Sequence, residues 1–211
     1  MKTRPSKPEQ KAEKRQDLKA IQEVLRKSLV TGEPFDYAAR AQQVIEAQHW
    51  NAVASSLRFR PSADPQTWDI HKATAERFWK ALDAAYPDGF WDDCEKLKAG
   101  NATGLESAVV FLEADPVFFR TGYLKTKLAR HIKQAMLTPP YIKRLQQVIL
   151  TAVDRRHDRD FRAYCNLARK ADAPELRAQL ESRLTDNDLD IRRRARWVLE
   201  ALAQKDSMEK A

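Results

Sequence analysis

Apolar residues recur along most of this chain at steps of three and four positions, which is the spacing of one face of an α-helix. The first run ends at Gly32 and Pro34, residues that break helices. Its apolar positions are Leu18, Ile21, Val24, Leu25 and Leu29. The spacing therefore predicts an amphipathic helix before residue 32.

The next segments are less regular. The run from Phe35 to about Arg60 changes phase near Gln48, which predicts two short helices. Pro65 is suited to the first turn of the following helix, which we expect to extend to about Ala85. A short amphipathic segment starts at residue 90. The sequence AGNATG at 99–104 predicts a soft boundary after it.

Beyond residue 104 the pattern becomes regular. The loops between the expected helices are so short that neighbouring helices should be antiparallel, which gives three helical hairpins. The expected helices are Leu105 to Ala114, Thr121 to Met136, Pro139 to Val153, Asp158 to Ala171, Pro174 to Leu184 and Asp188 to Gln204.

Short sequence features repeat within these hairpins. Pro139 and Pro174 open two of the first helices and lie 35 positions apart, a period typical of helical repeats. The second helices begin with DRDFR at 158–162 and DLDIR at 188–192, and DPVFFR at 115–120 is a weaker version. Three such matches at equivalent places indicate a repeated unit.

The segment LTDNDLDIRRRARWVLEAL at 184–202 resembles the HEAT repeat, including its PBS-lyase-type variant. The shared features are Asp186, Asp188, Ile191, Arg192, Ala195 and Leu199. The resemblance covers at most the C-terminal half. It implies a right-handed α-α superhelix, a HEAT-like solenoid of helical hairpins, preceded by irregular N-terminal helices. It also implies that Arg192, Arg162 and Arg120 bind loop acids and are structural.

Composition agrees with an all-α fold. The chain has 211 residues, 43% of them hydrophobic, with only 5 glycines. We expect one α-helical domain over 17–204, with N-terminal helices at 17–100 and HEAT-like repeats at 101–204. Residues 1–16 are rich in Lys and Arg and poor in apolar residues, which predicts a flexible basic tail. Residues 205–211 are expected to form a flexible C-terminus.

Positive charge is concentrated in the C-terminal half. The chain carries 38 Lys and Arg against 30 Asp and Glu, a net charge of +8. Between Arg120 and Arg196 there are nineteen basic and nine acidic residues. In a stack of hairpins, the outward residues of successive second helices would form one basic stripe. The candidate stripe residues are Arg130, Lys133, Arg159, Lys170, Arg193 and Arg196.

Three explanations of this stripe stay open: binding of an acidic protein, binding of nucleic acid phosphates, or a solvated helix surface without a ligand. We favour a non-enzymatic adaptor that docks an acidic protein partner. The alternative is a nucleic-acid-binding protein similar to the helical-repeat alkylpurine DNA glycosylases, which have a comparable size and charge. None of their catalytic positions matches here. Immunity to a toxin is a third possibility.

The residues give no reason to expect catalysis. The four histidines, His49, His71, His131 and His157, have no metal-ligand spacing, and no phosphate-binding glycine loop or nucleophile motif occurs. Asp92 and Asp93 form an acidic pair, but acids are expected in the first turn of a helix. We therefore predict no catalytic residue, no metal and no cofactor.

The sequence also favours a cytoplasmic protein. No apolar region follows the basic N-terminus, and no window is long and apolar enough to cross a membrane. Cys94 and Cys165 match no redox or zinc spacing, which is typical of reduced thiols in the cytosol.

Overall fold

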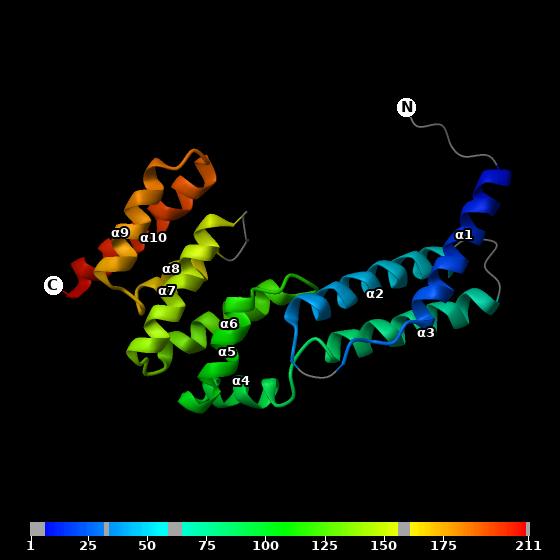
Figure 1. The fold of residues 1–211 in the computed structure, drawn as a ribbon, viewed down its shortest axis with the longest axis horizontal. Coiled ribbons are helices and arrows are strands. Elements are labelled where there is room, and N and C mark those ends of the chain that lie inside the picture. The colour runs from blue at the N-terminus through cyan, green and yellow to red at the C-terminus, as the bar shows by residue number, and fades with distance from the viewer. Residues whose placement is uncertain (1–6, 32–33, 59–64, 156–160, 210–211) are drawn as a thin grey trace. The chain divides into compact units, whose positions relative to one another are not determined.

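The computed structural model describes residues 7–31, 34–58, 65–155 and 161–209, and every regular element in these ranges is a helix (Figure 1). The all-α prediction is confirmed. The chain divides into two compact units, Met1–Pro87 and Asp88–Ala211, whereas the sequence suggested a boundary near residue 100.

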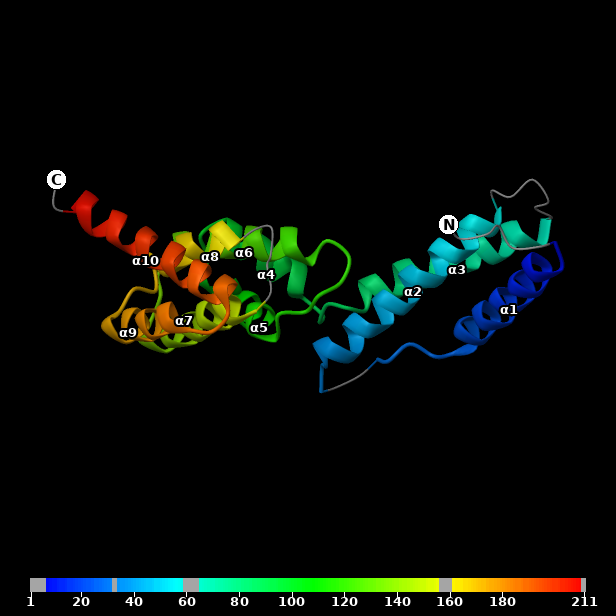
Figure 2. The ribbon, with the colours of Figure 1, turned by 90° about the horizontal axis from the view of Figure 1, so that it is seen from above.

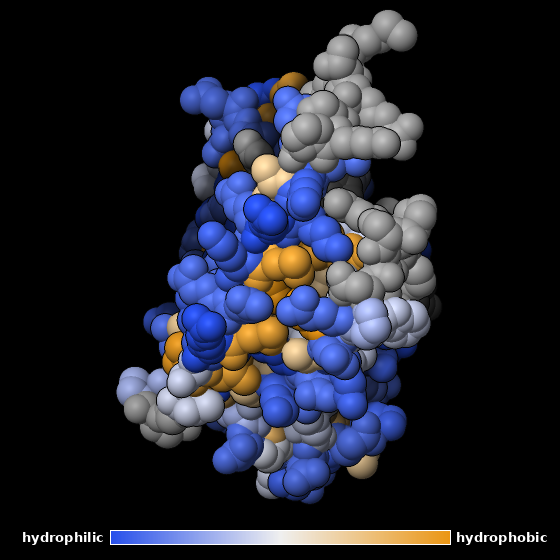
Figure 3. All heavy atoms as spheres, turned by 90° about the vertical axis from the view of Figure 1, so that its right-hand side faces the viewer, coloured by the Kyte–Doolittle hydropathy of each residue, from blue (hydrophilic) through white to orange (hydrophobic). Residues whose placement is uncertain are grey.

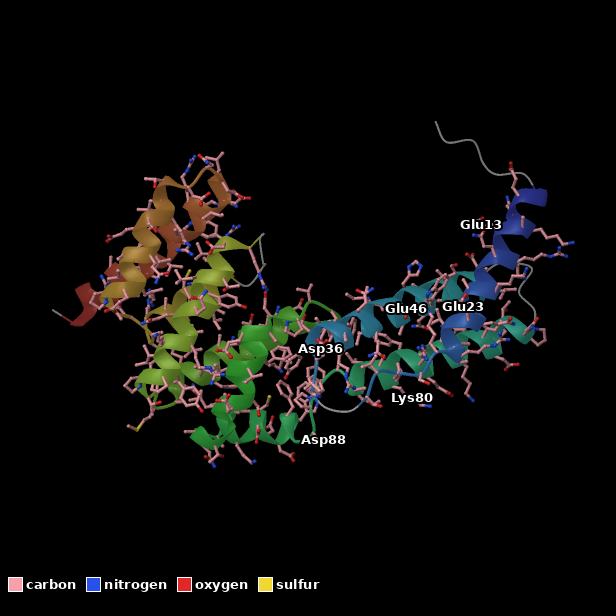
Figure 4. The ribbon with its side chains drawn as sticks, in the orientation of Figure 1. Glu13, Glu23, Asp36, Glu46, Lys80 and Asp88 are labelled. Carbon is pink, nitrogen blue, oxygen red and sulfur yellow. The ribbon has the colours of Figure 1, made fainter. Side chains whose placement is uncertain are left out.

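The first unit contains three long helices, α1 (Lys7–Arg26), α2 (Tyr37–Arg58) and α3 (Pro65–Asp83). Figures 1 and 2 show α2 and α3 side by side, and α1 contacts both. Asp36 caps α2, since its Oδ1 accepts hydrogen bonds from the amides of Ala38 at 2.8 Å and Ala39 at 3.1 Å (Figure 4). Pro65 occupies the first position of α3, as the sequence predicted.

The break that the sequence suggested near Gln48 does not exist, because α2 is one helix of 22 residues. The buried face moves around the helix, from Tyr37 and Ala41 near its start to Ala54 and Leu57 near its end. In its C-terminal half, Ala54 and Leu57 are buried together with Ile21 of α1 and Ile70 of α3. A rotation of the buried face around a continuous helix therefore imitates a helix boundary in the sequence.

Both predicted tails are largely helical. The predicted tail at 1–16 overlaps α1, which begins at Lys7, and residues 1–6 lie outside the described residues. At the other end, α10 (Leu189–Glu209) continues through most of 205–211. Lys, Glu, Gln and Ala have high helix propensity, so a helix started by a buried face extends through such solvated residues.

Apolar side chains also reach the surface of the first unit. Figure 3 shows apolar surface bordered by hydrophilic side chains on one face of the molecule. Phe78 is buried, but Trp68 and Trp79 are more than half exposed. The other large apolar residues exposed in this unit are Val30 and Ile45.

The second unit is built from shorter elements. They are α4 (Phe90–Lys98), η1 (Ala102–Gly104), α5 (Leu105–Ala114), α6 (Thr121–Gln134), α7 (Pro139–Asp154), α8 (Phe161–Ala168), α9 (Pro174–Ser182), η2 (Arg183–Thr185) and α10. The helices predicted beyond residue 104 are therefore present, although residues 156–160 lie outside the described residues and the predicted start at Asp158 is among them.

The helices of the second unit form two layers. The first helices contact in the order α5, α7, α9, and the second helices contact in the order α6, α8, α10. Figure 2 shows these two rows one above the other. Buried Leu128 and Ile132 of α6, Leu145 and Ile149 of α7, and Leu167 of α8 fill the space between them.

The segment 99–104 lies inside the second unit rather than at its edge, because α4 and η1 approach each other closely. A Cβ atom on Gly104 would lie 2.0 Å from the backbone oxygen of Asp93. Asp93 also accepts a hydrogen bond from the Ser107 hydroxyl at 2.5 Å. These contacts join α4 to α5. The boundary between the two units therefore lies before Asp88 and not near residue 100.

Charged side chains connect successive helices of the second unit. The Arg144 guanidinium of α7 donates two hydrogen bonds of 2.7 Å to Glu113 and one of 2.7 Å to Glu106, both on α5. Arg183 of η2 donates to both carboxylate oxygens of Asp154, at 2.6 Å and 2.7 Å. Such forked pairs have a fixed geometry and therefore hold neighbouring helices in register.

A basic groove between α6 and α8

The candidate functional site is a groove between two second helices, here called the basic groove. It has a cavity volume of about 380 Å³. Its lining residues are Thr126, Ala129, Arg130 and Lys133 of α6 and Arg162, Ala163 and Asn166 of α8.

The helix periodicity explains why these side chains meet. On α6, Leu128 and Ile132 are buried, so Arg130 and Lys133 lie on the opposite and adjoining faces and are exposed. On α8, the burial of Phe161 and Leu167 leaves Arg162 outside. Because α6 and α8 contact directly, these outward faces border the same groove. The small residues Ala129 and Ala163 leave space between the longer side chains.

The charge of the groove has one sign. Three of its lining residues, Arg130, Lys133 and Arg162, are cationic, and none of the described lining residues is acidic. Among the residues that the structure describes, no ion pair is recorded for these three cations. The Thr126 hydroxyl donates to the backbone oxygen of Gly122 at 3.0 Å. The groove can therefore offer cationic and amide hydrogen-bond donors to an anion.

Exposed aromatic residues lie on α6 and α10, two of the second helices. Tyr123 of α6 is 67% exposed and precedes Thr126 by one turn. Trp197 of α10 is 41% exposed, and its ring centroid lies 6.1 Å from that of Phe161, the residue before Arg162. The Arg193 guanidinium lies 5.2 Å from the Trp197 centroid. The outward surface of the second helices α6, α8 and α10, here called the second-helix face, therefore combines aromatic and cationic side chains.

The structure brings only part of the predicted stripe to the groove. Arg130 and Lys133 line it. Lys170, Arg193 and Arg196 are exposed but do not line it, and Arg159 lies outside the described residues. Arg193 also pairs with Asp190 on its own helix at 2.9 Å.

The α8 side chains Arg162 and Asn166 were not among the site residues predicted from the sequence, and neither were Thr126, Ala129 and Ala163. The repeat resemblance assigned Arg162 to a structural pair with loop acids. Arg162 is exposed and lines the groove, while the acids just before it, Asp158 and Asp160, lie outside the described residues. A helical wheel of 161–168 would have placed Arg162 and Asn166 opposite the apolar face. Of the other arginines assigned to loop acids, Arg192 donates to the backbone oxygen of Asp186 at 2.8 Å. The Arg120 guanidinium lies 5.0 Å from the Phe119 ring centroid.

Within the run RRRAR at 192–196, Arg194 is buried and only 3% exposed. Its Nε donates to the backbone oxygen of Val153 at 2.6 Å, which ties α10 to the end of α7. Its Nη1 is buried without a hydrogen-bond partner. The run RRRAR at 192–196 therefore contains both structural and exposed arginines.

His131 lies beside the groove residue Arg130 in the sequence but is half-buried. Burial lowers its pKa below the usual value, and the nearby positive charges of Lys98, Arg130 and Lys127 lower it further, against the opposing effect of Glu95. Its Nδ1 is buried without a hydrogen-bond partner. The folded structure therefore favours the neutral form of His131.

Two cysteines and Asp93 belong to residue types that can take part in catalysis. Burial raises the pKa of Cys94 and of Cys165 to about 11, so neither thiol ionises near neutral pH. Hydrogen bonds from Ser107 and Lys96 lower the pKa of Asp93, and both bonds are structural. Within the described residues, no cluster of His, Cys, Asp and Glu is suited to hold a metal ion, and no helix could span a membrane.

Comparison with known proteins finds no matching family model, no matching curated protein and no matching solved structure.

Proposed function

We propose that this chain is a non-enzymatic docking protein whose second-helix face, formed by α6, α8 and α10, binds an acidic protein partner. The observation that carries the proposal is the basic groove, in which Arg130, Lys133 and Arg162 border one cavity and no acid is found among the described lining residues. The proposal includes the HEAT-like solenoid that the repeats suggest, and the two-layer contacts of α5 to α10 support it.

The distribution of charge favours a protein over a nucleic acid. A nucleic acid backbone presents phosphates at regular intervals and is best bound by a continuous track of cations. On α10, by contrast, Arg193 is paired with Asp190, and the exposed Glu200 interrupts the positive surface. Three cations, Arg130, Lys133 and Arg162, meet in one groove. A compact anionic feature, such as a cluster of Asp and Glu side chains, matches this arrangement.

The aromatic residues favour the same partner. Trp, Tyr and Arg are the side chains most often responsible for binding energy at protein interfaces. Exposed Tyr123 and Trp197 are carried by helices of the second-helix face, close in sequence to Arg130 and Arg193. They would supply apolar contacts, while the groove would supply charge complementarity and orientation. Free Cys94 and Cys165 are consistent with a cytoplasmic location as part of this proposal.

Fluorescence anisotropy with a labelled glutamate-rich peptide and a labelled DNA duplex, each at low and high salt, tests this function. The unmodified chain should bind the peptide. Reversing the groove charges should reduce peptide affinity by at least about tenfold, because each lost contact is charge-assisted. The groove variant combines Arg130→Glu, Lys133→Glu and Arg162→Glu.

A variant of the first unit provides the matched control. Lys19, Lys72 and Lys80 are exposed, and Lys80 lies near the end of α3 (Figure 4). Changing all three to Glu alters the net charge by the same amount and should leave peptide affinity unchanged. If both variants lose the same peptide affinity, the attraction is unspecific and the proposal is contradicted. Tighter binding of the duplex, with a salt slope of about 0.9 per phosphate contact, would support a nucleic acid function instead.

A further inference from the structure

The geometry points to a phosphorylated side chain of the partner as the ligand of the basic groove, because cations from two helices, α6 and α8, border one cavity together with the Asn166 amide. This inference rests on the proposed function and specifies the group that the groove binds.

The charge of the groove exceeds what a carboxylate balances. Arg130, Lys133 and Arg162 contribute three positive charges, and none of the described residues that line the groove is acidic. A carboxylate contributes one negative charge. A phosphate monoester contributes about two at neutral pH, since its second pKa is about 6. The dianion therefore leaves less uncompensated charge among the three cations.

The donors are also distributed for a tetrahedral group. Arg130 and Lys133 approach from α6, and Arg162 and Asn166 approach from α8, so donors surround the cavity from two sides. A carboxylate has two oxygens in one plane, whereas a phosphate monoester has three terminal oxygens that point in different directions. Guanidinium groups bind phosphate oxygens through two parallel hydrogen bonds. Three oxygens can therefore engage both helices at once.

The size of the groove fits a side chain that enters from a partner. Its volume of about 380 Å³ lies within the range of pockets that hold small organic groups. Ala129 and Ala163 contribute no polar side-chain atom that would compete for the anion. A phosphorylated side chain can enter the cavity while the backbone of the partner stays outside, within reach of exposed residues such as Tyr123.

The test compares three probes with the full chain by isothermal titration calorimetry. The first two are short acidic peptides of identical sequence that carry either phosphoserine or glutamate at the central position, and the third is inorganic phosphate. We expect the phosphoserine peptide to bind at least about tenfold more tightly than the glutamate peptide. This advantage should disappear at pH 5, where the phosphate group carries a single charge.

Asn166→Asp is the sharpest variant, because it adds one negative charge to the groove with almost no change in shape. It should reduce affinity for the phosphoserine peptide by at least about tenfold. Gln147→Glu on α7, an exposed position on the other helix layer, makes the same charge change and should leave the affinity unaltered. Lys133→Ala, at an exposed position, serves the same purpose if Asn166→Asp alters the circular dichroism spectrum or the Tm.

The outcomes separate this inference from the proposed function. Equal affinities for the two peptides, both sensitive to the groove variants, would overturn the phosphorylated ligand and leave the acidic partner in place. If neither peptide binds, both proposals are wrong. Inorganic phosphate that binds as tightly as the phosphoserine peptide would assign the groove to free phosphate and overturn the side-chain ligand.

Discussion

The two units of this protein are held together in different ways. The first unit uses three helices of 19 to 22 residues, and α2 buries a series of small side chains, Ala41, Ala47 and Ala54, along its length. The helices α4 to α9 of the second unit have 8 to 16 residues. Short helices bury little surface each, and forked pairs such as Arg144 with Glu113 connect them.

This difference explains where the candidate site lies. In the second unit, neighbouring helices must be joined by side chains at their surfaces, so charged residues are frequent there and many are paired. The basic groove is the place where three cations, Arg130, Lys133 and Arg162, meet. In the first unit, the long helices α2 and α3 pack along their length, and its exposed residues are spread over these helices. The following changes test this contrast.

The largest effect is expected from Leu57→Ala in the first unit. Leu57 is 1% exposed and is buried with Ile21 and Ile70 of the neighbouring helices. Removing its side chain leaves a cavity and should lower the free energy of unfolding by about 3 kcal/mol. Urea titration followed by circular dichroism measures the change. A loss below about 1 kcal/mol would mean that the first unit does not depend on this burial.

Gly104→Ala should cost nearly as much in the second unit, about 2 to 3 kcal/mol, because the added Cβ would lie 2.0 Å from the backbone oxygen of Asp93. Gly100→Ala is the control. Gly100 has open space around it but a φ of +82°, so this change should cost only about 1 kcal/mol of backbone strain. If both variants lose the same stability, the close approach of η1 to α4 is not important.

A smaller loss is expected from Arg144→Ala, about 1 kcal/mol, since the pairs with Glu113 and Glu106 are partly exposed to solvent. Arg144→Lys should not restore the loss, because an ammonium group cannot form the forked hydrogen bonds. Lys27→Ala removes an exposed ion pair with Glu46 in the first unit. This variant should change stability by less than about 0.5 kcal/mol. A larger effect of Lys27→Ala than of Arg144→Ala would reverse the comparison.

The smallest effect concerns pH. The pKa of His131 is lowered in the folded protein, chiefly by burial, so the folded state favours the neutral imidazole. Its contribution to stability is complete above the usual pKa of about 6.5 and is lost as the pH falls from there through the lower pKa of the folded state. His131→Gln should therefore make stability less dependent on pH between 7 and 5. Thermal unfolding at several pH values measures this, and identical profiles for the two proteins would contradict it.

Much of the fold could be predicted from the sequence. The bounds of α5, Leu105–Ala114, agree with the expected helix, and Pro65, Pro139 and Pro174 begin helices as expected. The groove was only partly predictable. Arg130 and Lys133 were selected because they face away from the apolar side of their helix, whereas Arg162 was assigned to a structural pair. The role with loop acids that the resemblance implies for Arg162 stays a prediction, because Asp158 and Asp160 lie outside the described residues.

The sequence by itself determined that the chain is helical and where most helices begin, because propensity, proline position and the period of apolar residues act within a few residues of one another. The tertiary structure decided which helices became neighbours. It made α2 continuous, buried Arg194 while Arg193 and Arg196 stayed exposed, and brought Arg162 beside Arg130. These results depend on contacts between distant segments, whose packing no local pattern specifies.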